Sequence, residues 1–263
     1  NLFMTDPVRF IHLKNHTEYS LVDGLIRVKP LVKKAVELSM PAIGITDHVN
    51  LFATVKFYQA AVAAGVKPII GADVLIKDSI DQKKPYLLTL LVQNKAGYLA
   101  LSELISEAYL HGQEKGLPYL TTEKILANSE GLIVLSGAMQ GEIGQALMSE
   151  EMGLAQACLE RWTNILGDRF YLEVQRIGLP GEDAYIHQVV DLATNRGVPV
   201  VATNNSCFLA SEEFNAHEAR VCINQGRTLS DPRREKTHTQ QQYLKSQDEM
   251  LQLFEDLPEA LEN

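Results

Sequence analysis

The sequence has little cysteine and no excess of basic residues, and each shortage excludes a class of protein. Its three cysteines, Cys158, Cys207 and Cys222, are odd in number and show no C-x-x-C spacing, which argues against a disulfide framework and a zinc ribbon. The formal net charge is −9, so the chain as a whole has no sequence-independent attraction to phosphate backbones. We therefore expect a protein of the reducing cytoplasm that does not clamp DNA by itself.

Long apolar runs are lacking as well. No stretch approaches the roughly 18 consecutive apolar residues of a membrane-spanning helix, and the first residues show no basic segment followed by an apolar one. We expect neither export nor contact with a membrane. The 263 residues, 46% hydrophobic and 22% charged, are typical of a globular protein and suffice for one α/β barrel.

Short apolar runs alternate with longer segments of helical period. The strand candidates are Arg9–Leu13, Ala42–Thr46, Lys67–Ile76, Tyr86–Val92, Gly131–Leu135, Arg169–Val174 and Val198–Thr203. Helices are expected over Pro30–Leu38, Asn50–Ala64, 95–111 after a cap at Asn94, Asp183–Arg196 and Met250–Leu257. This order predicts the α/β class with a mainly parallel sheet, closed into a distorted seven-stranded (β/α) barrel. Without a linker-like segment, residues 1–263 are expected to form one domain; residues 1–3, before Met4, are either natural or an added remnant.

Polar side chains gather at the predicted strands, mostly where these end. They are His12, Lys14 and His16 at the first strand, Asp47-His48 at the second, Asp73 in the third, Glu173 at the sixth and Asn204-Asn205 at the seventh. The loops at the carboxyl ends of barrel strands build one face, so these residues are expected to converge. Imidazoles and carboxylates bind divalent metals that activate water and clamp phosphoryl oxygens, which indicates metal-assisted phosphoester hydrolysis.

A structural alternative stays open at this point. Asp47 and Glu173 would then cap nearby backbone amides, and the histidines would be satisfied structural groups. Judged on spacing alone, this alternative is favoured.

Residues 12–24 read HLKNHTEYSLVDG and resemble the opening motif H-L-H-x-H-[ST]-x-[YF]-S-x-x-D-G of a known family. It is the PHP (polymerase and histidinol phosphatase) domain of bacterial replicative polymerases, the DNA polymerase III alpha subunits. Further motifs follow in order at 42–51, 65–73, 93–98, 135–142, 201–204, 216–218 and 257–260. The resemblance covers nearly the whole chain. It implies a distorted seven-stranded barrel, and a polymerase core beyond residue 263 that holds the catalytic residues and Mg²⁺ of nucleotide transfer.

The chain departs from the family pattern at several metal-binding positions. Lys14 stands where a metal-binding histidine is expected, and a charged ammonium cannot ligate a cation. Asn205 and Cys207 take the places of the final Asp and His, and a buried thiol is favoured over a soft-metal ligand for Cys207. The remaining departures are Leu87, Ala138, Ile177 and Asp73, the last a shortened Glu.

The resemblance leaves a residual ligand set with room for at most one zinc or manganese ion, which the domain does not require. Its members are His16, Asp23, Asp47, His48 and Glu173. Lys14 is expected to replace the lost cation by pairing with Asp47 or Glu173, so that these carboxylates are not buried without compensation. No catalytic and no organic cofactor-binding residue is assigned within the chain.

The resemblance implies a parent protein that is a DNA-directed DNA polymerase, a nucleotidyltransferase, which contacts DNA through the missing domains. The domain itself is expected to be a structural module that docks the proofreading exonuclease (epsilon) subunit within the holoenzyme. The alternative is a residual metal-dependent phosphoesterase, either a 3′–5′ exonuclease or a pyrophosphatase. A free-standing histidinol-phosphate-type phosphatase is disfavoured by the polymerase-like motifs.

Overall fold

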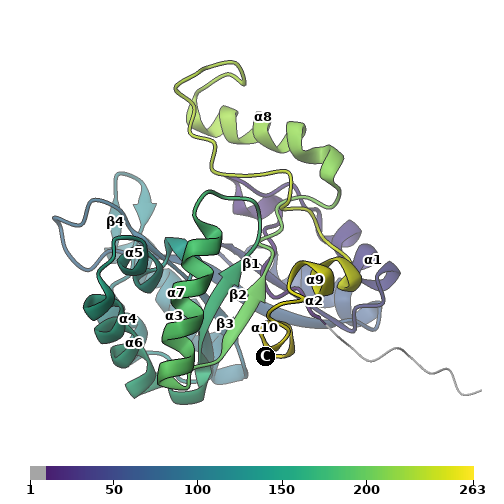
Figure 1. Cartoon of the computed structure of the whole chain (residues 1–263). Helices are drawn as coiled ribbons and strands as arrows, with labels where there is room; N and C mark the ends of the chain where they lie inside the picture. Colours follow the sequence, from purple (N-terminus) through teal and green to yellow (C-terminus); the bar gives the residue numbers. More distant parts are fainter. Residues whose placement is uncertain (1–9) are drawn as a thin grey trace, which may run out of the picture.

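One curled, mixed sheet organises residues 10–263, the part of the chain that the computed structural model describes (Figure 1). Its six strands there lie in the order β1 (Ala42–His48), β2 (Lys67–Ile76), β3 (Tyr86–Val92), β6 (Leu132–Leu135), β7 (Phe170–Gln175) and β8 (Val200–Thr203). A separate small sheet pairs β4 (Gln113–Glu114) with β5 (Leu117–Pro118). The α/β class and the distorted barrel expected from the sequence are confirmed.

The sheet is less parallel than expected. β1 pairs in parallel with β2, and β7 does so with both β6 and β8, but β3 is antiparallel to both of its neighbours. The reason is local: β2 and β3 are joined by the short polar segment 77–85 without a crossover helix, and a short connection can only return the chain antiparallel.

The expected first strand, Arg9–Leu13, is not a regular strand. Arg9 lies outside the described residues, and residues 10–13 form no strand. The segment 10–16 nevertheless bonds on both sides: Gly44 N donates to His12 O at 2.8 Å, and His16 N donates to Ser206 O, also at 2.8 Å. Close approach is possible because Gly44 lacks a side chain; a Cβ there would lie 2.3 Å from Leu13 O. An irregular segment thus bridges β1 and the chain after β8.

Helices cover the outside of the sheet (Figure 1). They are α1 (Val28–Glu37), α2 (Thr54–Ala63), α3 (Lys95–His111), α4 (Thr122–Ala127), α5 (Glu142–Met148), α6 (Met152–Leu166), α7 (Glu182–Arg196), α9 (Gln247–Leu253) and α10 (Glu259–Glu262). Single 3₁₀ turns are η1 (Glu18–Ser20), η2 (Ala138–Gln140), η3 (Gly167–Arg169) and η4 (Ser211–Glu213). The predicted cap is confirmed, since Asn94 Oδ1 accepts from Gly97 N at 3.0 Å. Among the described helices, none is long and apolar enough to cross a membrane.

The apolar core lies mainly between the sheet and these helices. The larger cluster packs β3, β6 and β7 against α3, α6 and α7, with Trp162 stacked on Phe170 at 5.7 Å between ring centroids. A second cluster joins α1, β1 and α2. Inside the curl, Leu91, Leu135 and Val201 form a small apolar layer. Polar side chains therefore occupy the rest of the interior.

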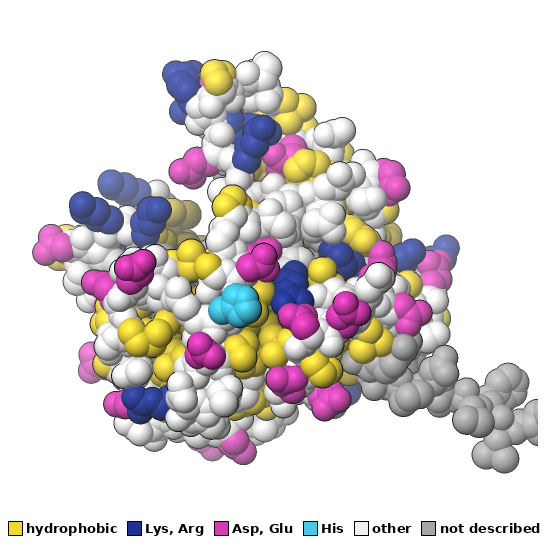
Figure 2. Space-filling view, viewed as in Figure 1, with side chains coloured by type: hydrophobic (Ala, Val, Ile, Leu, Met, Phe, Trp, Pro, Cys, Tyr) yellow, Lys and Arg dark blue, Asp and Glu magenta, His cyan; other side chains and the backbone are white. Residues whose placement is uncertain are grey.

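One helix and its return segment stand away from the barrel (Figure 1). We refer to α8 (Phe214–Gln225) with the following residues 226–242 as the arm. It returns to the barrel where Phe208 and Tyr243 form a β-bridge. Basic side chains are visible at its tip (Figure 2), but Arg227 and Arg233 both pair with Asp231, so part of this charge is neutralised locally.

Candidate metal and charge cluster

Several polar residues predicted from the sequence meet inside the barrel. The segment 10–16 supplies Lys14 and His16, β2 supplies Asp73, and β7 supplies Glu173. These four residues are at most 1% exposed. Because ionised groups this deeply buried need partners, the contacts among them decide what the site can bind.

Lys14 lies at one end of this buried cluster and supplies a cation from the chain itself. Its Nζ lies 3.3 Å from Asp73 Oδ2 and 3.6 Å from Glu173 Oε1. Burial opposes the charged ammonium, but the two carboxylates outweigh it and raise the pKa of Lys14. The same contact depresses the pKa of Asp73 to about 2 against the effect of its own burial. Lys14 is therefore charged, and a metal ion beside it would be repelled.

Glu173 is saturated by further donors. Its Oε1 accepts from Thr203 Oγ1 at 2.5 Å and from Gln175 Nε2 at 2.9 Å, and Oε2 accepts from Gly137 N at 3.1 Å. The expected pair between Lys14 and Glu173 is thus present. The second partner of Lys14 is Asp73 rather than Asp47, because Asp73 lies in the middle of β2 and faces the barrel interior.

Histidines surround the carboxylate of Asp23 at the other end of the cluster. Its Oδ2 lies 3.2 Å from His16 Nδ1, 2.9 Å from His48 Nε2 and 3.3 Å from His238 Nε2. Burial alone would raise the pKa of Asp23, but His48 and His16 lower it well below the usual value. This end of the cluster contains several imidazoles and an ionised carboxylate.

His16 connects the two ends. Its Nε2 lies 2.8 Å from Asp73 Oδ2, while its Nδ1 faces Asp23. Burial opposes the charge, but Asp23 and Asp73 outweigh it and raise the pKa of His16 well above its usual value. A ring with a carboxylate at each nitrogen donates from both, so in this arrangement it carries a proton rather than a free lone pair.

Asp47 is placed apart from these contacts. Its oxygens accept from Thr17 N at 2.6 Å, Thr17 Oγ1 at 2.7 Å and Ser20 Oγ at 2.8 Å. These donors fix the turn that leads to Asp23. The structural alternative, in which Asp47 caps backbone amides, describes its contacts better than a ligand role does.

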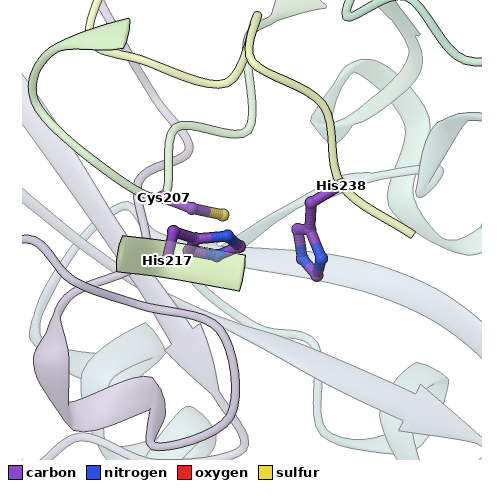
Figure 3. Close-up of side chains that lie close together, drawn as sticks. All are labelled: Cys207, His217 and His238. Carbon is purple, nitrogen blue, oxygen red and sulfur yellow. The ribbon is translucent and has the colours of Figure 1, made fainter. Parts of the chain in front are cut away.

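Three further side chains that could bind a metal lie close together near Asp23, where the arm meets the barrel (Figure 3). Ligand atoms of Cys207, His217 and His238 lie within 4.8 Å of one another. Burial and Asp23 oppose ionisation of Cys207, but hydrogen bonds with the surrounding histidines lower the pKa of its thiol to about 5. For His238, burial is outweighed by Asp23 and Cys207, and the pKa rises to about 10. An ion pair between thiolate and imidazolium is consistent with both shifts.

Sequence reasoning missed part of this group. His217 was noticed only within a family motif, and His238 lies in an irregular segment with no periodic or spacing signal around it. Cys207 was expected to be a buried thiol, and its side chain is indeed buried. The positions Leu87, Ala138 and Ile177 are buried apolar residues and supply no ligand atom.

The two ends therefore differ in what they fit. A cluster of bridged metal ions does not fit the Lys14 end, because an ammonium already lies between its carboxylates. At the other end, the set drawn in Figure 3 and the group of His16, Asp23 and Cys207 could supply ligand atoms. A third group, His16, His48 and Asp73, joins the two ends. His16 can act as a ligand only after it loses a proton. These residue types suit a single zinc-like ion better than Mg²⁺, which prefers oxygen ligands.

Comparison with known proteins places this geometry in context. A family profile described as "PHP domain" matches residues 12–177. DNA polymerase III subunit alpha of Pseudomonas fluorescens is 48% identical over 257 residues, which are 98% of this chain and 22% of the relative. The Escherichia coli K12 protein of the same description is 45% identical over 260 residues, 99% of this chain and 22% of its own length. The chain thus spans about a fifth of the length of these relatives.

A solved structure shares the fold at low sequence identity. An amidohydrolase from Chromobacterium violaceum is 11% identical with a TM-score of 0.52, covering 80% of this chain and 96% of that protein. This likeness concerns the fold alone.

Proposed function

The chain belongs to the PHP domain family, and from this premise we propose that it is the N-terminal portion of a DNA polymerase III alpha subunit. The observation that carries the proposal is 48% identity over 98% of the chain with a protein of that description. The whole protein would then be a cytoplasmic DNA-directed DNA polymerase. Its catalytic residues and Mg²⁺ would lie outside this chain, and residues 1–263 would form its PHP domain.

We further propose that the domain itself is a structural and docking module rather than a hydrolase. The contacts of Lys14 with Asp73 and Glu173 support this, since a fixed ammonium takes the place that a catalytic metal cluster would need. Without that cluster, no water is activated and no phosphoryl oxygen is clamped at this end. A replicative polymerase with such a domain would leave proofreading to a separate subunit, the exonuclease (epsilon).

An exposed apolar stripe supports a role in binding another protein. Phe52, just before α2, is 63% exposed, and Val55, Tyr58 and Val62 of α2 are 65%, 54% and 54% exposed. Their spacing places the three helical residues on one face. Several exposed apolar side chains on one helix face are typical of interaction sites. We propose that this stripe contributes to the surface that binds the exonuclease subunit.

Co-elution experiments on the purified chain and its variants test docking and the role of the stripe separately. Co-elution with the cognate exonuclease subunit at micromolar concentration is expected, and the double variant Val55→Asp/Val62→Asp is expected to lose it. A control double variant on two other helices, Glu103→Lys in α3 and Glu123→Lys in α4, should retain it. Absence of co-elution for the unchanged chain would contradict docking, whereas loss of binding in both variants would deny the stripe a specific role.

The alternative function, a metal-dependent phosphoesterase, is favoured by the ligand atoms of His16, His48 and Asp73, which lie within 4.8 Å of one another. It predicts turnover of a generic phosphodiester, of DNA with a 3′ end or of pyrophosphate when Mn²⁺ or Zn²⁺ is added. The docking proposal predicts no turnover. Metal-dependent hydrolysis that disappears in His16→Gln would establish the alternative and exclude a contaminating enzyme.

A further inference from the structure

We propose that Cys207, His217, His238 and Asp23 form a binding site for one zinc-class ion, which fastens the arm to the barrel. The three side chains of Figure 3 come from separate parts of the chain: the segment after β8, helix α8 and the return segment of the arm. Asp23 comes from the loop after η1. An ion at their centre would join four segments that no disulfide connects among the described residues.

The spacing of the donors is close to that of a tetrahedral site. Zinc with sulfur at about 2.3 Å and nitrogen at about 2.0 Å separates neighbouring ligand atoms by roughly 3.3–3.6 Å. His238 Nε2 and Asp23 Oδ2 are already 3.3 Å apart. The atoms of Cys207, His217 and His238 lie within 4.8 Å of one another, and those of Cys207 and Asp23 within the same limit. Small side-chain rotations would therefore complete the coordination.

The environment of His217 independently indicates a ligand. This residue is 0% exposed, and its Nε2 lies 2.6 Å from the carbonyl oxygen of Asp23. Because a carbonyl can only accept, Nε2 carries the hydrogen and the lone pair of the neutral ring is on Nδ1. Among the described residues, Nδ1 is buried and has no hydrogen-bond partner. The nearest acidic group to Nδ1 is Glu218, whose Oε1 lies 3.6 Å away, beyond hydrogen-bond distance. A ring held by one nitrogen, with no hydrogen bond at the other, is the usual arrangement of a metal-binding histidine.

Charge and ligand type favour zinc-class ions. A thiolate and a carboxylate together neutralise a divalent cation, so the ion and its ligands carry no net charge in this buried position. Thiolate and imidazole ligands select zinc or cobalt over magnesium and calcium. His16 and His48, at 3.2 and 2.9 Å from Asp23 Oδ2, would hold the carboxylate from behind.

This ligand set differs from the one that the family pattern implies. Asp23 belongs to the ligand set that the resemblance implies, and Cys207 replaces a histidine of that pattern, whereas His217 and His238 belong to the arm. The ion would also lie at the end of the cluster opposite Lys14. The site would be structural, and it depends neither on phosphoester hydrolysis nor on docking of the exonuclease.

Cobalt(II) provides a direct test because it reports its own ligands. The experiment uses the whole chain with Cys158→Ala and Cys222→Ala, so that Cys207 is its only thiol. Titration with Co²⁺ is expected to saturate at one ion per chain, with a thiolate-to-cobalt charge-transfer band and the intense visible bands of tetrahedral cobalt. Added Zn²⁺ should abolish both signals by displacement.

Variants then assign the ligands. Cys207→Ser should lose the charge-transfer band, and His238→Gln should lower the Co²⁺ affinity at least about tenfold. The control His111→Gln changes an exposed histidine of α3, 65% exposed in its side chain, and should behave like the parent chain. Circular dichroism checks that each variant folds; His238 lies in an irregular segment, so its replacement tests the site even if Cys207→Ser does not fold. Saturation without a charge-transfer band, no binding at all, or unchanged affinity in His238→Gln would overturn the proposal.

Discussion

The two ends of the buried cluster contain similar residue types, but their carboxylates are neutralised by different partners. At one end, Asp73 and Glu173 are compensated by Lys14, a cation supplied by the chain itself. At the other, Asp23 is surrounded by His16, His48 and His238, whose charge depends on bound protons. A lysine is a permanent partner and excludes metal, whereas histidines and a thiol can exchange their protons for an ion. Taken together, our proposals describe a barrel that has no catalytic metal cluster at one end and keeps a structural metal site at the other.

The largest expected effect comes from removing the built-in cation. Lys14→Met removes the ammonium from between two buried carboxylates, and breaking a buried pair in this way costs about 3–5 kcal/mol of unfolding free energy. Urea denaturation at neutral pH measures it. Cys207→Ser at the other end, in metal-free buffer, is expected to cost no more than about 1–2 kcal/mol. Equal losses of unfolding free energy in the two variants would show that the two ends do not differ in how strongly they stabilise the fold.

Lysine at an exposed position provides the matched control. Lys56 is near Glu18 at 3.9 Å, and its side chain is 48% exposed, so Lys56→Met should change stability by less than about 1 kcal/mol. A comparable loss in this variant would mean that the Lys14 result reports net charge rather than burial.

Zinc should stabilise only through the other end. A ligand at 100 times its dissociation constant that binds only the folded state adds about 2.7 kcal/mol to the unfolding free energy. We expect this gain for the unchanged chain and its absence in His238→Gln, measured by thermal denaturation with and without Zn²⁺. If His238→Gln is stabilised as much as the unchanged chain, the ion binds elsewhere.

Acid should weaken the Lys14 end in a defined range. The pKa of Asp73 is about 2 in the folded chain against an ordinary value of 3.8, so folding favours its ionised form. This stabilisation is complete above about pH 4 and is lost as the pH falls toward 2; the difference corresponds to roughly 2 kcal/mol. Urea denaturation between pH 5 and 2.5 should show a smaller pH dependence for Asp73→Asn than for the unchanged chain. Parallel curves would remove Asp73 as the source.

Asp47 tests the boundary of the metal site and should give the smallest effect. Its three hydrogen bonds with Thr17 and Ser20 predict that Asp47→Asn costs about 1–2 kcal/mol, because an amide cannot accept from all of these donors. Binding of Co²⁺ should be unchanged once the variant is folded. A large loss of Co²⁺ affinity would return Asp47 to the ligand set.

The sequence was informative where periodicity and caps control the structure. Lys67–Ile76 and Tyr86–Val92 were predicted with the bounds they have in the fold, since continuous apolar runs flanked by polar segments define them. The helix after Asn94 also begins and ends as expected. Arg9–Leu13 was predicted to be a strand, but its described residues 10–13 belong to an irregular segment that bonds to two neighbours without a regular ladder.

The candidate site was harder to predict because contacts, not residue types, assign the roles. Asp73 was predicted to be a shortened Glu outside the residual ligand set, yet it contacts both Lys14 and His16. Asp47 was placed among the ligands by its motif, but its oxygens face Thr17 and Ser20. His238 has no local signal at all, and only the return of the arm brings it to Asp23.

The segment that closes the barrel also affects when the chain can fold during synthesis. His16 N bonds to Ser206 O, a partner 190 residues further along the chain. At elongation rates of about 5–20 residues per second, that partner is added to the chain roughly 10–40 s after His16. For most of this interval Glu173 has not been added either, so Lys14 lacks that partner. The inner face of the sheet stays open until Ser206 is in place. The nascent domain therefore spends this time incompletely closed, in the state in which chaperones bind and aggregation begins.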